Sequence, residues 1–260
     1  MASHPAGAPA PAVSRTGVRT AVVWDYLRAA IGSLGGDGDA LQVLDAGGGS
    51  GGFAVPLAQL GHHVTVVDPS PDSLAALERR AAETGTEQRI TALQGDAAGL
   101  DGLVPAGGFH LALCHSVLEV VDEPPAALRA VGRALRPGGL ASILAANRSA
   151  AVVHRVAAGR FGEARALLDG PSADGAAGTA GAGDVLLHRF DLDELQVLLT
   201  DAGMRVRTVH GVRLFTDAAP SALLDDPQAV EELLALERAA AEKPEYLPFA
   251  TQLHVIAAHD

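Results

Sequence analysis

The sequence predicts an α/β fold in which a seven-stranded, mostly parallel sheet carries helices on both faces. Three observations support this prediction. Short apolar segments alternate with helical patterns along most of the 260 residues, a glycine-rich turn follows the first apolar segment, and 48% of the residues are hydrophobic, enough for a sizeable core. Strands and helices that alternate along a chain are typical of a parallel sheet with right-handed crossovers.

The expected elements follow one another in a regular order. A first helix is expected over about 17–34, because Trp24, Leu27 and Ile31 recur at spacings of three and four and give it one apolar face. Ser70 and Pro71 are typical of the start of a later helix. Strands are expected at 41–46, 64–68, 90–93, 110–114, 140–145, 206–209 and 251–258. A further helix is expected to follow the glycine-rich turn and to end at residue 60, and others are expected at 150–168, 191–202 and 227–242.

The expected organisation is a single domain over residues 17–260, since α/β domains of this length are common. Residues 1–16 are rich in Ala and Pro and are expected to form a disordered tail. Helical insertions are expected after strands five and six. The first covers about 147–190 and includes a glycine-rich, flexible loop at 170–183, and the second, at about 217–250, is expected to form a helical lid.

The charge and the cysteine content restrict the partners and the compartment. A formal net charge of −12 gives the chain no general attraction for nucleic acid or for an anionic membrane, although a local basic cleft stays compatible with it. The single cysteine, Cys114, excludes an internal disulfide and fits a reducing cytoplasm. No apolar stretch reaches the length of a transmembrane helix, so no membrane partner is expected.

The glycine-rich turn at 47–52 is the strongest chemical signal in the sequence. It lies between a buried strand and a helix, the place where a Rossmann-like sheet meets its ligand. Asp68 ends the next strand, where an acid can bind two ribose hydroxyls. Gly47, Gly49 and Gly52 also fit the dinucleotide pattern, so the glycines alone leave a dinucleotide, another adenosine cofactor and a simple tight turn as alternatives.

Two acids favour S-adenosylmethionine (SAM) over a dinucleotide. Asp45 directly precedes the turn, where its charge suits the cationic amino group and sulfonium of SAM and would repel a pyrophosphate. Asp96 follows the third strand, a position at which methyltransferases commonly carry an acid that faces the adenine amino group. We therefore expect SAM as the cofactor, bound by Asp45, by the turn that includes Gly49, and by Asp68 and Asp96.

Several motifs resemble those of class I SAM-dependent methyltransferases, namely VLDAGGGSGG (43–52), VVDPS (66–70) and LRPGG (135–139). Others narrow the resemblance to the bacterial tRNA 5-carboxymethoxyuridine methyltransferases, and these are HSVLEVV (115–121), GVRLF (211–215), the segment 231–244 and QLHV (252–255). The SAM motifs are generic, whereas GVRLF and the C-terminal segment are more specific. The likeness runs from about Arg19 to the C-terminus.

The resemblance assigns roles to individual positions. It implies that Arg19 on the first helix holds the cofactor's carboxylate, that Asp68 binds the ribose, and that His115 contacts the cofactor. Asn147 matches an asparagine that lies next to the methyl donor. The backbone positions that it places near the cofactor are Gly47, Gly48, Ala97 and Ala98.

The resemblance also implies the reaction, in which a carboxylate on a modified tRNA uridine is esterified by direct methyl displacement. A carboxylate is ionised at neutral pH, so no general base is required and no catalytic residue is assigned. Positioning alone can contribute roughly 7–11 kcal/mol. Arg213 is the candidate clamp for the acceptor, because a guanidinium fork matches two carboxylate oxygens, and Asn147 is the second substrate candidate. A surface role for Arg213 is the alternative.

One departure from the family pattern weakens the case for tRNA. The residues after the insertion helix form the neutral, glycine-rich stretch 170–183, where a member of that family carries a run of lysines that would engage phosphates. A SAM-dependent O- or N-methyltransferase of a small metabolite is therefore the main alternative. A non-catalytic SAM- or dinucleotide-binding protein is a remote one.

The remaining candidates are expected to be structural. Cys114 and His115 are adjacent on a strand, so they point to opposite faces and cannot form a dyad, and Cys114 is expected in the core. No histidine or carboxylate cluster has metal-ligand spacing, so no metal is expected. Arg155, Arg160 and Arg165 are expected on a solvated face, with phosphate binding as the alternative.

Overall fold

The computed structural model describes residues 15–35, 39–169 and 186–260. The loop expected at 170–183 lies outside the described residues, as does the tail expected at 1–16 except for its last two positions. These two residues open the first helix, α1 (Arg15–Leu34), which begins two residues earlier than predicted. Within the described residues, none of the helices combines the length and the apolar character that crossing a membrane requires.

The chain forms a seven-stranded sheet, as the alternating pattern predicts. Its strands are β1 (Gln42–Ala46), β2 (His63–Asp68), β3 (Ile90–Gln94), β4 (Phe109–His115), β5 (Leu135–Ala146), β6 (Met204–Val212) and β7 (Gln252–His259). They lie in the order β3-β2-β1-β4-β5-β7-β6. All neighbouring pairs from β3 to β5 are parallel, and only β7 runs against its two neighbours.

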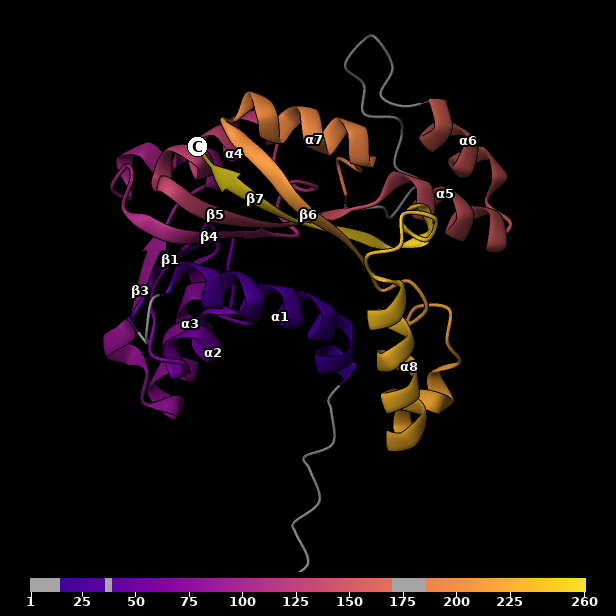
Figure 1. The fold of residues 1–260 in the computed structure, drawn as a ribbon, viewed down its shortest axis with the longest axis horizontal. Helices are drawn as coiled ribbons and strands as arrows, with labels where there is room; N and C mark the ends of the chain where they lie inside the picture. The colour runs from indigo at the N-terminus through magenta and orange to yellow at the C-terminus, as the bar shows by residue number, and fades with distance from the viewer. Residues whose placement is uncertain (1–14, 36–38, 170–185) are drawn as a thin grey trace, which may run out of the picture.

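Helices cover both faces of this sheet (Figure 1). On one face lie α1, α2 (Ala54–Gln59) and α3 (Pro71–Thr84), and on the other lie α4 (Pro124–Ala134) and α7 (Leu192–Asp201). The cap predicted for α3 is present, since Ser70 Oγ accepts a hydrogen bond from the Ser73 N–H and Pro71 is the first helical residue. Short 3₁₀ helices, η1 (Glu87–Arg89), η2 (Ala97–Gly102), η3 (Ser221–Asp225) and η4 (Leu247–Phe249), connect the other elements.

Two helical segments extend beyond these layers. Between β5 and α7 lie α5 (Arg148–Ala157) and α6 (Phe161–Asp169), where the sequence predicted one continuous helix. Gly159 separates them with a φ of 72°, a left-handed conformation that ends a helix at little steric cost. Between β6 and β7 lies α8 (Pro227–Ala240), which stands beside α1 (Figure 1), where Val18 packs against Val230 and Leu234.

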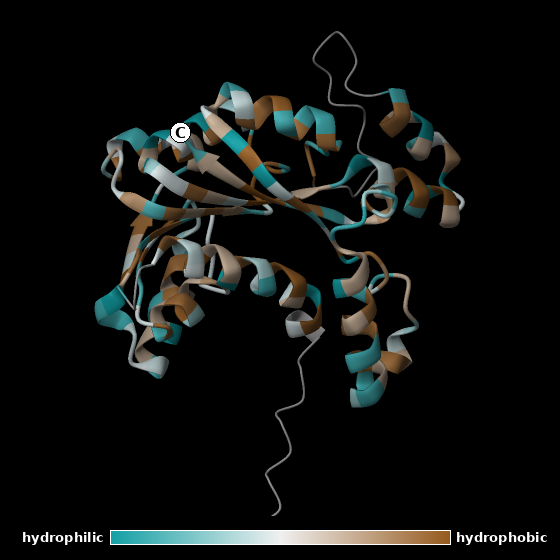
Figure 2. Cartoon of the chain, in the orientation of Figure 1, coloured by the Kyte–Doolittle hydropathy of each residue, from teal (hydrophilic) through white to brown (hydrophobic). Residues whose placement is uncertain are grey.

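The inner strands β2, β1, β4, β5 and β7 are mostly apolar and buried between the helical layers, whereas the edge strands β3 and β6 are more exposed (Figure 2). The predicted core position of Cys114 is confirmed, because its side chain is fully buried in the cluster beneath α4. This burial raises the pKa of the Cys114 thiol, which is therefore neutral and unreactive at physiological pH.

The orientation of the last two strands decides which residues reach the functional edge. β6 is antiparallel to β7, and β7 is antiparallel to β5, so β6 runs in the same direction as β5. The end of β6, followed by Arg213, and the start of β7 at Gln252 therefore lie at the same edge as the carboxyl ends of the parallel strands. This topology gathers segments that are about 200 residues apart in the sequence at one edge, and Arg19 reaches it from α1.

Candidate functional site

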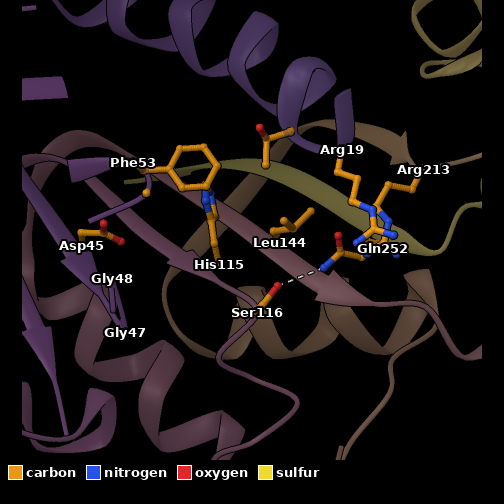
Figure 3. Close-up of a pocket in the computed structure, with 12 residues that line it drawn as sticks. Arg19, Asp45, Gly47, Gly48, Phe53, His115, Ser116, Leu144, Arg213 and Gln252 are labelled. Atoms are coloured by element: carbon orange, nitrogen blue, oxygen red, sulfur yellow. Dashed lines mark hydrogen bonds between the residues drawn. The ribbon is translucent and has the colours of Figure 1, made fainter. Parts of the chain in front are cut away.

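A cavity of about 330 Å³ opens at this edge of the sheet. It is lined by Arg19, Thr20, Asp45, Gly47, Gly48, Gly52, Phe53, His115, Ser116, Leu144, Arg213 and Gln252. Figure 3 shows Asp45 and the glycines at one end of the cavity, and Arg19 and Arg213 at the other, with Phe53 and His115 between them. The cavity therefore has an acidic end and a basic end.

The glycine turn forms the floor of the acidic end. Gly47 has a φ of 76°, and its N–H donates to the carbonyl oxygen of Val67 at 2.7 Å. A Cβ atom on Gly48 would lie 2.5 Å from Cγ of Asp45 and 2.9 Å from Cγ1 of Val66. These two positions cannot carry a side chain without moving their neighbours, which keeps the backbone open toward the cavity.

Asp45 is the acid of this end and is 2% exposed. Its Oδ2 is buried without a hydrogen-bond partner among the described residues. Burial raises the pKa of Asp45 to about 7, and the negative charge of Asp68 adds to the effect. An unpartnered buried carboxyl group of this kind is suited to receive a cationic ligand.

Asp68 lies on the far side of the glycine turn and is held by backbone groups. Its Oδ2 accepts a hydrogen bond from Gly49 N–H at 2.9 Å, and its Oδ1 accepts one from Ser70 N–H at 2.9 Å. Each oxygen keeps one lone pair, so a pair of hydroxyl donors can still bind. Asp68 therefore contacts the predicted residue Gly49, although neither lines the cavity itself.

Asp96, Ala97 and Ala98 form a separate corner of the predicted cofactor site. Asp96 caps the short helix η2 by accepting a hydrogen bond from Ala98 N–H at 2.7 Å. Asp96 is exposed, whereas Ala97 is buried. These residues follow β3, two strands away from β1, so the structure places them at the same edge but outside the cavity.

Five lining residues outside the glycine turn were missed by the sequence reasoning: Thr20, Phe53, Ser116, Leu144 and Gln252. Ser116 has a φ of 56°, and its Oγ accepts a hydrogen bond from Gln252 Nε2 at 3.0 Å (Figure 3). Gln252 is the first residue of the QLHV segment, so the sequence analysis identified its motif but did not predict that its side chain lines the site. Phe53 directly follows the glycine turn, and its ring lies edge-on to His115 at 4.6 Å between centroids.

The basic end is built around one shared acid. Asp217 Oδ2 lies 2.6 Å from Nη2 of Arg213, and Asp217 Oδ1 lies 3.9 Å from Nη2 of Arg19. Nε of Arg213 is buried without a hydrogen-bond partner among the described residues. Arg213 also has a φ of 58°, which is uncommon for a residue with a side chain and fits a position fixed by its surroundings. The interpretation of Arg213 as a surface residue is not favoured, since it lines the cavity and is about one quarter exposed.

Glu237 of α8 holds the turn that carries Arg213. Its carboxylate is 1% exposed and accepts hydrogen bonds from three consecutive backbone N–H groups, those of Leu214, Phe215 and Thr216, at 2.8–3.0 Å. It also accepts one from the Thr216 hydroxyl at 2.6 Å. The GVRLF motif is thereby held by a residue of α8 that follows it by about 20 positions.

We expect Glu237→Gln to destabilise the fold by about 2–4 kcal/mol, because an amide NH₂ would face N–H donors and leave a buried group unsatisfied. Thermal unfolding should show a melting temperature lower by about 5–10 °C. Glu232→Gln on the exposed face of the same helix is the matched control, since its carboxylate is exposed and accepts from Gln228 Nε2 at 3.1 Å. Equal melting temperatures for the two variants would contradict this account of Glu237.

Asn147 has a different environment from the one expected of a substrate-binding residue. Its Nδ2 donates to the carbonyl oxygens of Leu247 and Ala250 at 2.9 and 2.8 Å, and its Oδ1 accepts from Ser149 N–H. It is 3% exposed and does not line the cavity. The structure favours a structural role, in which Asn147 caps α5 and fastens it to the segment before β7.

The arginines of the insertion face neighbouring acids. Arg155 and Arg160 lie 3.3 and 3.8 Å from the carboxylate of Glu163, and Arg165 lies 3.8 Å from Asp169. This pairing reduces the positive charge that α5 and α6 present to a phosphate backbone. In the described part of the chain, no group of three or more His, Cys, Asp or Glu side chains could hold a metal ion.

Comparisons with known proteins bear on the fold and on the enzyme class. A family profile described as "Methyltransferase domain" matches residues 43–139, which span β1 to the start of β5. The tRNA 5-carboxymethoxyuridine methyltransferase of Escherichia coli K12 is 28% identical over 246 residues, which cover 92% of this chain and 87% of the relative. A ubiquinone biosynthesis O-methyltransferase of Methylocella silvestris is 37% identical over 116 residues, or 43% of this chain and 42% of the relative.

Solved structures share the fold at lower identity. A SAM-dependent methyltransferase from Mesorhizobium loti superimposes with a TM-score of 0.59 at 22% identity, covering 93% of this chain and 100% of the other. The magnesium protoporphyrin IX methyltransferase of Synechocystis with bound S-adenosylhomocysteine gives 0.57 at 17% identity, covering 95% and 83%. The sequence motifs, the fold and the relatives agree: the chain is a class I SAM-dependent methyltransferase that resembles the bacterial tRNA 5-carboxymethoxyuridine methyltransferases, and SAM is its cofactor.

Proposed function

We propose that the cavity binds the amino-acid part of SAM and that the enzyme esterifies a carboxylate held by Arg213. The carboxylate of 5-carboxymethoxyuridine in tRNA is the first candidate acceptor. The observation that carries this proposal is the arginine at the basic end, which lines the cavity with a buried, unpartnered Nε although one of its other nitrogens is already paired with Asp217. SAM supplies the methyl group, and the residues of the chain supply its orientation.

The residues present fit SAM. The unpartnered Oδ2 of Asp45 would bind the amino group, and Arg19 at the opposite end would bind the carboxylate. The glycines would let the cofactor lie against the backbone, and the free lone pairs of Asp68 would accept from the ribose hydroxyls. The corner formed by Asp96, Ala97 and Ala98 would meet the adenine. In this proposal, all of residues 17–260 serve one methyltransferase domain, with α8 as part of a lid over the basic end.

The titratable groups favour a carboxylate over a hydroxyl acceptor. A hydroxyl must lose its proton during methyl transfer and benefits from a base with a pKa near the working pH. Burial lowers the pKa of His115, the imidazole that lines the cavity, to about 3, so it is a poor base. A carboxylate is already ionised and needs only to be held in place.

A small metabolite remains the second candidate acceptor. The net charge of −12, the ion-paired arginines of the insertion and the partial likeness to ubiquinone biosynthesis O-methyltransferases support it. The likeness to the tRNA enzyme extends over nearly the whole chain, including the GVRLF segment, and this breadth is why we place tRNA first.

The test is transfer of labelled methyl from SAM into tRNA that bears 5-carboxymethoxyuridine, followed by mild alkaline treatment. We expect label on that nucleoside that is released by alkali, because an ester hydrolyses under these conditions and an ether does not. Binding of SAM without any transfer to tRNA would exclude this acceptor and would favour a small carboxylic acid.

A further inference from the structure

A row of polar side chains crosses the sheet beneath the cavity. In the strand register, His115 on β4 pairs with Leu144 on β5, Leu144 pairs with His254 on β7, and His254 pairs with His210 on β6. Residues that are directly paired across strands point to the same face of a sheet. The three histidines therefore lie in one row on the face covered by α1, and Ser142 lies on this face as well, two residues before Leu144.

These side chains form a continuous hydrogen-bonded chain. His115 Nε2 lies 2.8 Å from Ser142 Oγ, which in turn lies 2.8 Å from His254 Nε2. His254 Nδ1 lies 3.2 Å from His210 Nδ1. Ser142, His210 and His254 are completely buried, and the ring of Tyr26 stacks on that of His210 at 3.4 Å between centroids.

The two ends of the chain are unsatisfied. Nδ1 of His115 and Nε2 of His210 are buried without a hydrogen-bond partner among the described residues. Buried polar groups are nearly always paired, and leaving one unpaired costs about 1–3 kcal/mol. His115 lines the cavity, so its ring lies within reach of a bound cofactor.

Counting hydrogens shows that this chain has two states. Burial lowers the pKa of all three histidines, so each ring is neutral and carries one N–H. Together with the Ser142 hydroxyl there are four hydrogens for three hydrogen bonds, and the fourth must lie at one end. When it lies on His115 Nδ1, every bond points from His210 toward His115, and when it lies on His210 Nε2, every bond is reversed. Each state is uncharged, and the two differ in which nitrogen of each ring carries the hydrogen.

We propose that Ser142, His254 and His210 are positioning residues for His115, and that they fix its ring and set whether its Nδ1 donates to or accepts from the cofactor. An acceptor atom on the ligand selects the state with hydrogen on His115 Nδ1, and a donor atom selects the reverse. This inference rests on the cavity being the SAM site. It adds to the proposed function a polar chain that reaches across four strands to residues far from the cofactor.

Cofactor affinity tests this inference, measured by calorimetry with S-adenosylhomocysteine. Ser142→Ala cuts the chain in its middle, and we expect its Kd to rise about five- to twentyfold. The matched control is Thr86→Val, which removes another buried hydroxyl, one that donates to Ala81 O at the end of α3 and away from the cavity. The control should bind within about twofold of the wild type.

A second variant and a spectroscopic measurement separate positioning from general loss of stability. His210→Phe keeps the stack on Tyr26 and removes the last link, and we expect it to raise the Kd as well. Ring ¹⁵N shifts should show one fixed tautomer of His115 in the complex and a mixture in Ser142→Ala. Variants that bind like Thr86→Val, or an unchanged His115 tautomer, would overturn the inference. A wild-type protein that binds no S-adenosylhomocysteine would instead overturn the assignment of the cavity, and the inference with it.

Discussion

Arg213→Ala is expected to lower kcat/KM for the carboxylate acceptor by a factor of about 10²–10³, while the Kd for SAM stays within about threefold of the wild type. The reason is that a charge-assisted, two-pronged contact to a carboxylate is lost and the acceptor is left without its counter-ion. Arg213→Lys should recover only part of the activity, because an ammonium lacks the planar fork. Steady-state kinetics with the tRNA acceptor and calorimetry with SAM measure the two quantities separately.

Asp217 pairs with both Arg213 and Arg19, so the effect of Arg213→Ala on SAM binding is best measured together with a double variant. Without Arg213, Asp217 loses its 2.6 Å partner and would attract Arg19, the expected ligand of the cofactor's carboxylate. The double variant Arg213→Ala, Asp217→Ala removes this competition and should keep SAM affinity while remaining inactive. Arg205→Ala is the matched control, since Arg205 is an exposed residue of β6, the strand that Arg213 follows, and it pairs with Asp260. Loss of SAM affinity equal to the loss of activity in the double variant would show that Arg213 serves the cofactor and not the acceptor.

The parallel half of this molecule could be predicted from the sequence because its signals are local. Each apolar run, the glycine turn and the cap at Ser70 depend on residues within about ten positions, and all correspond to elements of the structure. The acids Asp45 and Asp68 were found for the same reason, since each stands at the end of a strand. Their roles toward the cofactor stay predictions.

The basic end and the buried chain could not be predicted in the same way. The row of histidines exists only because β7 lies between β5 and β6 in one particular antiparallel register, and no local pattern specifies that register. Asp217 stands four residues after Arg213, yet the sequence offered no reason to pair it with Arg19. Asn147 is the opposite case, because the resemblance predicts a substrate contact whereas in the structure the amide fastens two segments, and the contact stays a prediction.

Asp45 connects cofactor binding to stability, and the two are expected to change in opposite directions. Burial raises the pKa of its carboxyl from 3.8 to about 7 in the folded protein. Below about pH 4 the group is protonated in both the folded and the unfolded state, so its burial as a charge does not lower the free energy of unfolding. As pH rises toward 7 the unfolded state releases its proton first, so stability falls, by on the order of 4 kcal/mol once pH exceeds 7. A cationic ligand beside Oδ2 reverses this effect, because it favours the ionised form.

Asp45→Asn should therefore stabilise the cofactor-free protein at pH 8 and leave its stability unchanged near pH 4. The same variant should bind SAM about 100-fold more weakly at pH 8, because the ammonium loses its counter-ion. In the wild type, SAM affinity should fall up to tenfold per pH unit below pH 7, and this slope should vanish in the variant. Thermal unfolding without cofactor and calorimetry between pH 5.5 and 8 measure both effects, with Asp101→Asn, an exposed acid paired with Arg133, as the control. A variant that is both less stable at pH 8 and normal in SAM binding would show that Asp45 supports the fold and not the cofactor.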